Sequence, residues 1–338
     1  MTMIRKWGKL SSENFEQVLN SDVTLMRVVR DGNMRYVLAD EFGEIAGVLS
    51  GKMKKSMENG GGAPCIGDWV EVLARPLDVE EVVIERIMPR ETCLKRKNAG
   101  AGVDIQNMAS NVDTVFICTS INDDLNVRRI ERFGIISKGS GADTVVVLTK
   151  SDLVDDPKEV ANALQKRLGS TLVVTANATG ETGYDEVKAL MRPHKTYAFI
   201  GSSGVGKSTL INGLMGEDIM TTSGIRNDDK GRHTTTHRQM LRSPEGHLLI
   251  DMPGVREVQL YDDKDALNLA FEDIAELAIQ CKFNDCKHEN EPGCAVNQSI
   301  DNGEIDYDRL VNYKKMLREM DAYWKRTGRG KFKSSRKR

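Results

Sequence analysis

The sequence has few of the features that mark membrane or secreted proteins. It contains no apolar run approaching the 18 residues that a transmembrane helix needs. Its start, MTMIRKWGK, lacks the apolar core of a secretion signal. The formal net charge of −2 is too small to indicate a class of partner. We therefore expect a cytoplasmic protein with no membrane partner, in which local rather than overall charge selects what is bound.

The six cysteines do not have the distribution of a disulfide framework. Three are scattered, whereas Cys281, Cys286 and Cys294 lie close to His288, and in a cytosolic chain such a cluster indicates metal. Three thiolates and one imidazole form a complete tetrahedral set for Zn²⁺. Because no coordination position stays open for a substrate, we expect one structural zinc ion. The alternative is a group of buried thiols beside a surface histidine.

The chain length of 338 residues suggests two or three domains. In residues 1–92, apolar residues alternate in five short segments, Leu25–Val29, Arg35–Leu38, Ile45–Leu49, Asp68–Leu73 and Val82–Ile87. Five such strands suit an N-terminal OB-type β-barrel that binds RNA. The segment Ser50–Pro64 combines lysines with three consecutive glycines and predicts a mobile basic loop; a solvated linker without a partner is the alternative.

A different pattern follows a polar, basic linker at residues 93–110. Apolar runs at Val112–Thr119 and Thr144–Leu148 are typical of buried parallel strands. Helical spacing at Val127–Lys138 and Pro157–Leu168 alternates with these runs, and Asp156 is a candidate helix cap. Further strands are predicted at Leu172–Val174, Tyr197–Ile200 and Leu248–Ile250. Residues 111–262 therefore form an α/β domain in this interpretation.

The remaining residues are helical in pattern and then strongly basic. Apolar stripes at helical spacing predict an α-helical domain over residues 263–324, which contains the zinc cluster. Residues 325–338 contain no acidic side chain and predict a disordered tail. The tail, the linker and the lysine-rich loop could each neutralise RNA phosphates.

A complete phosphate-loop motif, G-x-x-x-x-G-K-[ST], lies between a predicted strand and a predicted helix. Its residues are Gly201, Ser202, Ser203, Gly204, Val205, Gly206, Lys207 and Ser208, and Thr209 continues into the helix. The glycines let backbone N–H groups surround phosphate oxygens, and the helix N-terminus attracts anions. We expect Lys207 to bridge the β- and γ-phosphates and Ser208 to bind Mg²⁺.

The base is indicated by Thr149-Lys150-Ser151-Asp152, at the carboxyl end of a predicted strand where ligands bind in such sheets. The Asp152 carboxylate can accept two hydrogen bonds from guanine, whereas adenine offers no such pair of donors. The stem of Lys150 can lie over the base. Ala176, after the next strand, could offer a backbone N–H to guanine O6. These residues predict GTP and GDP as ligands.

Two segments resemble the switches of GTPases. Asp251-Met-Pro-Gly254 follows a strand, so Asp251 is expected to hold Mg²⁺ through water and Gly254 to sense the γ-phosphate. Residues 231–236 (GRHTTT) offer a threonine to Mg²⁺; we favour Thr235, with either neighbour, or a polar loop without a ligand, as alternatives. The base element precedes the phosphate loop and both switches, which is a circular permutation of the usual order.

The residue after Gly254 is Val255, where many GTPases place a glutamine that orients water. Valine cannot hydrogen-bond to water, so we predict slow intrinsic hydrolysis. His233 is the best internal candidate for the missing group, because an imidazole can orient water or accept its proton. A group supplied by the target is the alternative.

The permuted order, the GRHTTT and DMPGVRE segments and the EPGCAV end of the zinc cluster together resemble the RsgA/YjeQ family. The resemblance implies an N-terminal OB domain, a permuted GTPase domain and a helical zinc domain. It also implies a late role in maturation of the small ribosomal subunit, whose rRNA would be a partner and which would stimulate GTP hydrolysis. We expect a monomer.

Two other functions fit the residues. The chain could be an RNA-binding assembly protein that uses GTP mainly as a conformational ligand, and Val255 keeps this alternative open. It could also be a GTPase that acts on another RNA target. Measuring GTP turnover with and without ribosomal subunits would distinguish these functional hypotheses.

Overall fold

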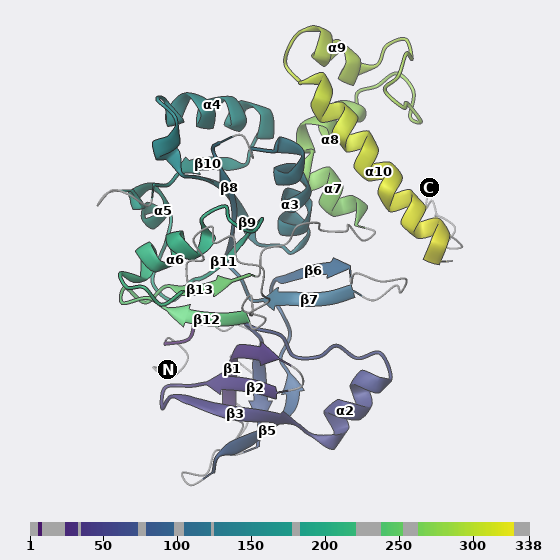
Figure 1. Cartoon of the computed structure of the whole chain (residues 1–338). Coiled ribbons are helices and arrows are strands. Elements are labelled where there is room, and N and C mark those ends of the chain that lie inside the picture. Colours follow the sequence, from purple (N-terminus) through teal and green to yellow (C-terminus); the bar gives the residue numbers. More distant parts are fainter. Residues whose placement is uncertain are drawn as a thin grey trace, which may run out of the picture.

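The computed structural model describes residues 6–8, 24–32, 35–73, 79–97, 105–122, 125–177, 183–220, 238–252 and 263–327. These residues build a β-barrel, a central α/β domain and a helical domain at the C-terminal end (Figure 1). This order confirms the fold class predicted from the sequence. Within the described part of the chain, no helix is both long and apolar enough to cross a membrane.

Five strands close the N-terminal barrel, and each one overlaps a segment predicted by alternation. They are β1 (Thr24–Gly32), β2 (Arg35–Ala39), β3 (Glu44–Leu49), β4 (Trp69–Val72) and β5 (Glu81–Ile87). The strand order β1-β2-β3-β5-β4 closes through an additional β1–β4 pairing. Inward side chains such as Met26, Val70 and Ile84 are fully buried and fill the interior.

The prediction of a mobile loop at Ser50–Pro64 is wrong, because much of this segment forms the helix α2 (Gly51–Glu58). The Ser50 Oγ atom caps this helix by accepting a hydrogen bond from the Met53 N–H at 3.2 Å. Met53 packs into the barrel core, while the three lysines of α2 stay exposed. The glycine run that suggested a loop begins only after the helix, whose Lys, Met and Glu residues are good helix formers.

Residues 93–110, assigned to a linker from the sequence, form a β-hairpin. Its strands are β6 (Cys93–Lys97) and β7 (Ile105–Ser110), and they pair antiparallel. Leu94 and Ala109 are fully buried. The Ser110 N–H donates to the Ile66 carbonyl of the barrel at 3.0 Å, and the Cys93 N–H donates to the Ser140 carbonyl of the α/β domain, also at 3.0 Å. The segment is therefore a structured bridge.

The α/β domain is built on six strands. They are β8 (Thr114–Ser120), β9 (Asp143–Thr149), β10 (Leu172–Thr175), β11 (Thr196–Gly201), β12 (Arg238–Arg242) and β13 (Leu248–Asp251). Their order is β10-β9-β8-β11-β13-β12, and every pairing is parallel except that of β12 with β13. The sequence did not predict β12, because RQMLR is short and largely polar.

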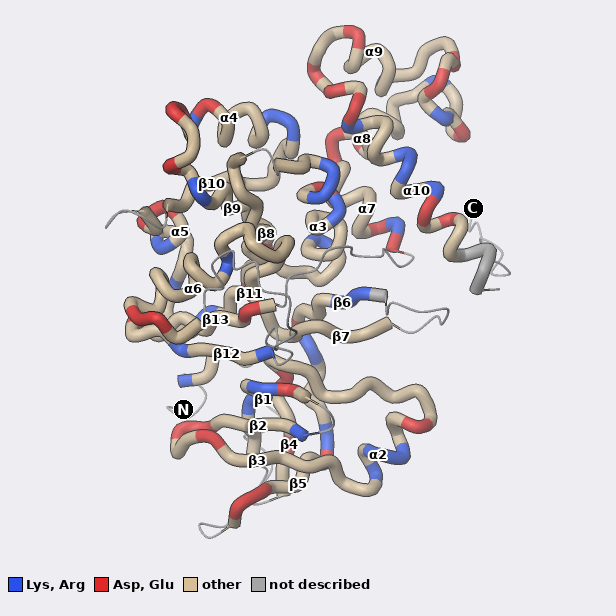
Figure 2. Tube along the Cα trace, in the orientation of Figure 1, with Lys and Arg blue, Asp and Glu red and all other residues tan. Residues whose placement is uncertain are grey.

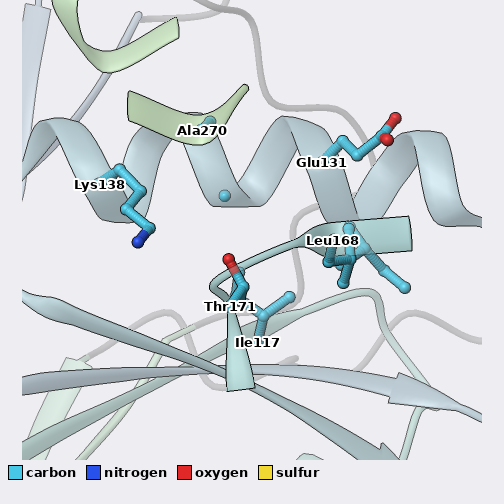
Figure 3. Close-up of a pocket in the computed structure, with 8 residues that line it drawn as sticks. Ile117, Glu131, Lys138, Leu168, Thr171 and Ala270 are labelled. Atoms are coloured by element: carbon cyan, nitrogen blue, oxygen red, sulfur yellow. The ribbon is translucent and has the colours of Figure 1, made fainter. Parts of the chain in front are cut away.

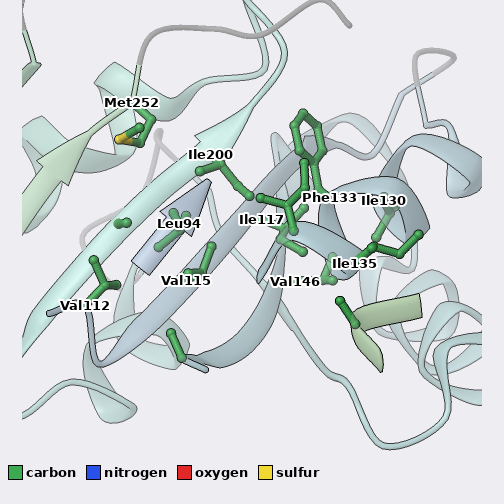
Figure 4. Packing of buried hydrophobic residues seen from close by; sticks show 14 of the residues in the cluster. Leu94, Val112, Val115, Ile117, Ile130, Phe133, Ile135, Val146, Ile200 and Met252 are labelled. Atoms are coloured by element: carbon green, nitrogen blue, oxygen red, sulfur yellow. The ribbon is translucent and has the colours of Figure 1, made fainter. Parts of the chain in front are cut away.

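Helices cover both faces of this sheet. The α3 helix (Val127–Gly139) and the α4 helix (Pro157–Leu168) share one core with alternate strand residues such as Ile117 and Ile200 (Figure 4). The α5 helix (Asp185–Ala189) and the α6 helix (Lys207–Met215) share the opposite core, which includes Phe116 and Phe199. The helices predicted from spacing are confirmed as α3 and α4, and Asp156 caps α4 through two backbone N–H groups at 3.0 Å.

The C-terminal domain contains α7 (Lys264–Ala270), α8 (Glu272–Ala278), α9 (Ala295–Asp301) and α10 (Tyr307–Thr327). The buried Phe271, with φ of −121°, separates α7 from α8 within what the sequence presents as one apolar stripe. The last helix continues to Thr327, three residues into the segment predicted as a tail. Residues 328–338 lie outside the described part of the chain.

The barrel joins the α/β domain through one continuous sheet. Strands β1 and β12 pair antiparallel, with Arg30 opposite Gln239 and Asp31 opposite Arg238, so the sheet has eleven strands.

Arg27 crosses this junction as a buried side chain. Its guanidinium donates to the carbonyls of Trp7 at 2.6 Å, Gly67 at 3.1 Å and Asn111 at 2.9 Å, and to the Thr196 hydroxyl at 3.1 Å. The side chain is only 1% exposed. One arginine therefore ties the barrel, the bridge and β11 together.

The helical domain joins α3 through charged side chains. Arg309 of α10 donates to the Glu131 carboxylate at 3.0 Å and to both Asp273 oxygens at 2.6 and 2.8 Å. Asn312 also donates to Glu131. Burial raises the pKa of Glu131, and Arg309 and Asn312 partly oppose that shift. Figure 3 shows Glu131 on α3 beside a small pocket that Leu168, Ile117 and Ala270 also line.

Candidate nucleotide and zinc sites

The strand order reverses direction between β8 and β11. From β8 the chain winds outward through β9 to β10, whereas after β11 it forms β12 and then β13 on the other side, with β13 lying between β11 and β12. The two strands are parallel neighbours, and Cys118 lies opposite Gly201 at their carboxyl ends. Ligands of wound α/β sheets bind in the crevice outside such a reversal point. The predicted phosphate loop begins in this crevice.

Backbone conformation and close packing explain the glycines of the phosphate loop. Gly204 and Gly206 have φ of +78° and +96°, which favour glycine. A Cβ atom at Gly201 would lie 2.3 Å from the Cys118 carbonyl oxygen, so only glycine fits there. The loop ends at Lys207, the first residue of α6. Its backbone N–H groups and the helix N-terminus can therefore surround an anion, as the sequence predicts.

Lys207 is buried and turned back onto its own loop. Its Nζ atom donates to the carbonyls of Gly201 at 3.2 Å and Ser202 at 2.8 Å. Burial lowers the pKa of Lys207, while Cys118 and Asp251 oppose that shift. A phosphate oxygen would give this ammonium a charged partner in place of a neutral carbonyl.

The base element is bonded directly to the phosphate loop. The Thr149 hydroxyl, at the end of β9, lies within hydrogen-bond distance of the Val205 carbonyl and of the Thr119 carbonyl, the latter at 3.1 Å, and donates its single proton between them. The next residue, Lys150, has φ of +57° and turns the chain into the 3-10 helix η1 (Ser151–Leu153). Asp152 lies exposed in this helix. Thr149 thus fixes the base element relative to the phosphates, a role that the sequence did not reveal.

The segment after β10 closes onto the same edge. The Ala176 carbonyl accepts from the Ser151 N–H at 3.2 Å, and the Ala176 N–H donates to the Leu148 carbonyl at 2.8 Å. The Asn177 N–H donates to the Gly183 carbonyl, also at 2.8 Å. If the Ala176 N–H bound guanine O6, it would therefore have to give up its hydrogen bond to the Leu148 carbonyl.

The carboxylate of Asp251 is placed as a ligand of a metal ion would be. It ends β13, and its Oδ1 atom is buried without a hydrogen-bond partner among the described residues. Burial raises the pKa of Asp251 to about 6, and Lys207 opposes the shift. An unpartnered carboxylate oxygen near a phosphate loop suits Mg²⁺, which prefers oxygen ligands. Ser208, half-buried in the first turn of α6, is the other predicted protein ligand within the described chain.

Three predicted site residues lie outside the described residues. They are His233 and Thr235 of the first switch and Gly254 of the second, and Val255 lies outside them as well. Their roles stay predictions.

The predicted zinc ligands come together. The four ligand atoms of Cys281, Cys286, His288 and Cys294 lie within 4.8 Å of one another. The Sγ atoms of Cys281 and Cys294 are 3.9 Å apart, close to the roughly 3.8 Å that Zn–S bonds of about 2.3 Å give in a tetrahedron. His288 Nδ1 lies 3.4 Å from the Cys294 Sγ atom. These residues therefore fit one structural zinc ion.

Backbone contacts hold this cluster in place. The Cys294 Sγ atom caps α9 by accepting from the Asn297 N–H at 3.4 Å. Lys314 of α10 donates to the His288 carbonyl at 2.7 Å. The Glu291 carboxylate accepts from the N–H groups of Lys287 at 2.9 Å and Glu289 at 2.8 Å. The metal loop is thus anchored to two helices.

Comparison with known proteins extends over nearly the whole chain. Residues 87–261 match the family model described as RsgA GTPase. The chain is 44% identical over 274 residues to "Small ribosomal subunit biogenesis GTPase RsgA" of Methanosarcina acetivorans, which covers 81% of this chain and 74% of that relative. It is 41% identical over 316 residues to "Small ribosomal subunit biogenesis GTPase RsgA 2" of Lactiplantibacillus plantarum, which covers 93% and 88%.

Two solved structures share the architecture. YjeQ from Thermotoga maritima superposes with a TM-score of 0.67 at 27% identity, covering 88% of this chain and 98% of that one. YloQ, a circularly permuted GTPase, superposes with a TM-score of 0.63 at 21% identity, covering 89% and 96%, and this second likeness concerns the fold alone. The permuted order of the motifs is therefore shared by a solved structure.

Proposed function

This chain belongs to the RsgA GTPase family, and from that membership we propose that it hydrolyses GTP on the small ribosomal subunit and assists late maturation of the subunit. Its reaction is hydrolysis of GTP to GDP and phosphate, and its cofactor in that reaction is Mg²⁺. The target is proposed from relatives named small ribosomal subunit biogenesis GTPases. We propose further that the protein contacts ribosomal RNA, acts as a monomer and works in the cytoplasm.

The observation that carries a nucleotide-driven role is the meeting of three segments at one sheet edge. The phosphate loop follows β11, Thr149 ends β9 and Asp251 ends β13, all at the carboxyl edge of the same sheet, and the Thr149 hydroxyl bonds to the phosphate loop. Mg²⁺ at Ser208 and Asp251 would supply positive charge to the phosphates. Lys207 would exchange the carbonyls of its own loop for phosphate oxygens, so nucleotide binding reorders contacts inside the loop.

Positive side chains on the barrel support an RNA partner. Lys52, Lys54 and Lys55 lie exposed on α2 (Figure 2). The capped α2 helix holds these three side chains on its exposed side, away from the barrel core. Each phosphate they neutralise would release counterions and make binding weaker at higher salt.

The side chain that orients the attacking water is proposed to be His233. Valine at position 255 has no hydrogen-bonding side chain, so the enzyme needs a donor or acceptor from another segment. We assign this role to His233, with a group of the ribosomal subunit as the alternative.

The decisive experiment measures GTP turnover by the enzyme alone, with small subunits and with large subunits. We expect stimulation by small subunits only, and its loss in the His233→Ala variant with nucleotide affinity unchanged. Turnover that responds to neither subunit would overturn the proposed target. Turnover in His233→Ala equal to that of the unsubstituted enzyme would assign water positioning to the ribosome.

Base recognition is tested by changing Asp152 to Asn. Xanthine carries a carbonyl where guanine carries its exocyclic amine, so an amide at this position matches xanthine better. Asp152→Asn should weaken GTP binding and strengthen binding of xanthosine triphosphate. Asp155→Asn, two residues beyond η1, is the matched control and should leave both affinities unchanged. Unchanged GTP affinity in Asp152→Asn would remove Asp152 from the base site.

A further inference from the structure

One hydrogen bond crosses the crevice between β8 and β11. The Arg129 Nη1 atom donates to the Ser202 Oγ atom at 3.0 Å. Arg129 lies in the first turn of α3, which follows β8, and Ser202 is the second residue of the phosphate loop, which follows β11. The two segments are neighbours because their strands pair in parallel.

The backbone of Arg129 is fixed while its side chain is exposed. The Asn126 side chain caps α3 by accepting from the Arg129 N–H at 3.0 Å. The guanidinium itself is not held by burial. A capped helix therefore places a long cationic side chain at the mouth of the phosphate loop, where it can change partner without moving the helix.

The other arginines of α3 have carboxylate partners. Arg128 lies 3.7 Å from Asp308, and Arg132 forms a two-point pair with Glu319 at 2.7 and 2.8 Å. Among the described residues, the Arg129 side chain bonds only to the neutral Ser202 hydroxyl. A charged phosphate oxygen would be a stronger acceptor than that hydroxyl.

We propose that Arg129 is a catalytic arginine supplied by the enzyme's own α3. When GTP fills the loop, the guanidinium leaves the Ser202 hydroxyl and donates to a γ-phosphoryl oxygen. The oxygen of water bonds to the γ-phosphorus as the bond to the bridging oxygen breaks, and that electron pair stays on GDP. The proton released by water ends on the phosphate product or in solvent. Arg129 stabilises the negative charge that is redistributed during this step.

The inference rests on GTP hydrolysis and not on the identity of the target. The test compares Arg129→Gln, Arg129→Lys and Arg128→Gln with the unsubstituted enzyme. Single-turnover hydrolysis of bound GTP is measured at saturating Mg²⁺, alone and with small subunits, and GDP affinity is measured in parallel. Arg128 is the matched control, since it is the adjacent residue and its partner Asp308 lies in the helical domain.

We expect Arg129→Gln to hydrolyse GTP on the order of 10³-fold more slowly, as removal of other catalytic arginines does. GDP affinity should change by less than about threefold, because GDP has no γ-phosphate. Arg129→Lys should recover part of the rate, and Arg128→Gln should match the unsubstituted enzyme.

Two outcomes would overturn the assignment. One is an unchanged rate in Arg129→Gln under both conditions. The other is an equal loss of GDP and GTP affinity with an unchanged rate, which would make Arg129 a general attractor of phosphate. Absence of stimulation by small subunits would count against the proposed target, yet the rate of Arg129→Gln alone would still decide the role of the arginine.

Discussion

The two domains that flank the α/β domain are attached in different ways. The barrel joins it through backbone pairing of β1 with β12 and through the buried Arg27, whose acceptors are mostly carbonyls. The helical domain joins α3 through a shared apolar core that includes Ile130 and Leu267, and also through ionised side chains, with Arg309 bonded to both Glu131 and Asp273. A junction of backbone groups keeps its partners at any ordinary pH, whereas a junction of carboxylates can be titrated. Both junctions include a carboxylate that is at least partly buried, Asp31 beside Arg238 in the barrel junction and Glu131 beside Arg309 in the helical one, but only the barrel junction also has backbone pairing that does not depend on pH.

The largest expected effect is that of Arg27→Met on the barrel junction. Methionine keeps part of the volume but leaves the Trp7 and Asn111 carbonyls and the Thr196 hydroxyl without the Arg27 donor, whereas the Gly67 carbonyl keeps the Asn111 side-chain amide at 2.9 Å. Each buried unpaired group costs about 1–3 kcal/mol, so the loss of these three bonds should lower the free energy of unfolding by about 3–9 kcal/mol in urea titrations. Arg30→Met, on the same strand but paired with Glu44 at the surface, should cost less than about 1 kcal/mol. Equal losses in the two variants would contradict the role of Arg27.

Arg309→Met should have the next largest effect, on the helical junction. It leaves the buried Glu131 with only the more distant Arg167, at 3.9 Å, as a cation, and loss of the closer pair should cost up to about 3–5 kcal/mol of unfolding free energy. Adding Glu131→Leu should restore most of that loss, because an apolar pair replaces an unpaired charge. Arg132→Met, whose pair with Glu319 is part-exposed, is the control and should cost less than about 1 kcal/mol. A double variant as unstable as the single one would show that the junction does not depend on this charge.

The smallest expected effect is the pH dependence that Glu131 gives to the helical junction. Burial raises the pKa of Glu131 above its value in the unfolded chain, so its contribution is fully present at low pH and is lost as pH rises through the raised pKa. Stability should therefore fall more steeply above about pH 4.3 in the unsubstituted protein than in Glu131→Gln. Urea midpoints of both proteins between about pH 4.5 and 8 measure this. Parallel curves would assign the pH dependence to other groups.

Arg27 itself should not contribute within that window, although Asp31, 3.5 Å from Arg238 across the barrel junction, also has a pKa raised by burial. Burial lowers the pKa of Arg27 to about 10, which lies above the range of the measurement. Arg27→Met should therefore be destabilised by the same amount at both ends of the range.

Features that depend on residues close together in the chain could be predicted from the sequence. The barrel strands follow a period of two residues, α4 has both a cap and a proline at its start, and the phosphate loop is a contiguous motif. The zinc ligands were readable because Cys and His lie within fourteen residues of one another. Each of these signals depends on near neighbours in the chain.

The side chains that hold the domains together had no such signal. Arg27 and Thr196 are 169 residues apart, Arg309 and Glu131 are 178 apart, and Arg129 and Ser202 are 73 apart. A long charged side chain in a helix or strand looks the same whether it faces solvent or a partner. Only the strand order shows that α3 begins beside the phosphate loop. The short polar β12 was missed for a related reason, since its pairing with β1 comes from the fold.

The pairing of β1 with β12 also has a consequence for shortened forms of the protein. Within the α/β domain β12 pairs only with β13, and its other side is covered by the barrel. Removal of the barrel would leave a row of unpaired N–H and C=O groups along β12. Such open edges are templates for pairing with a second chain. The barrel therefore shields the rest of the molecule from aggregation, and a fragment without it would need a substitute cover to remain a single, soluble chain.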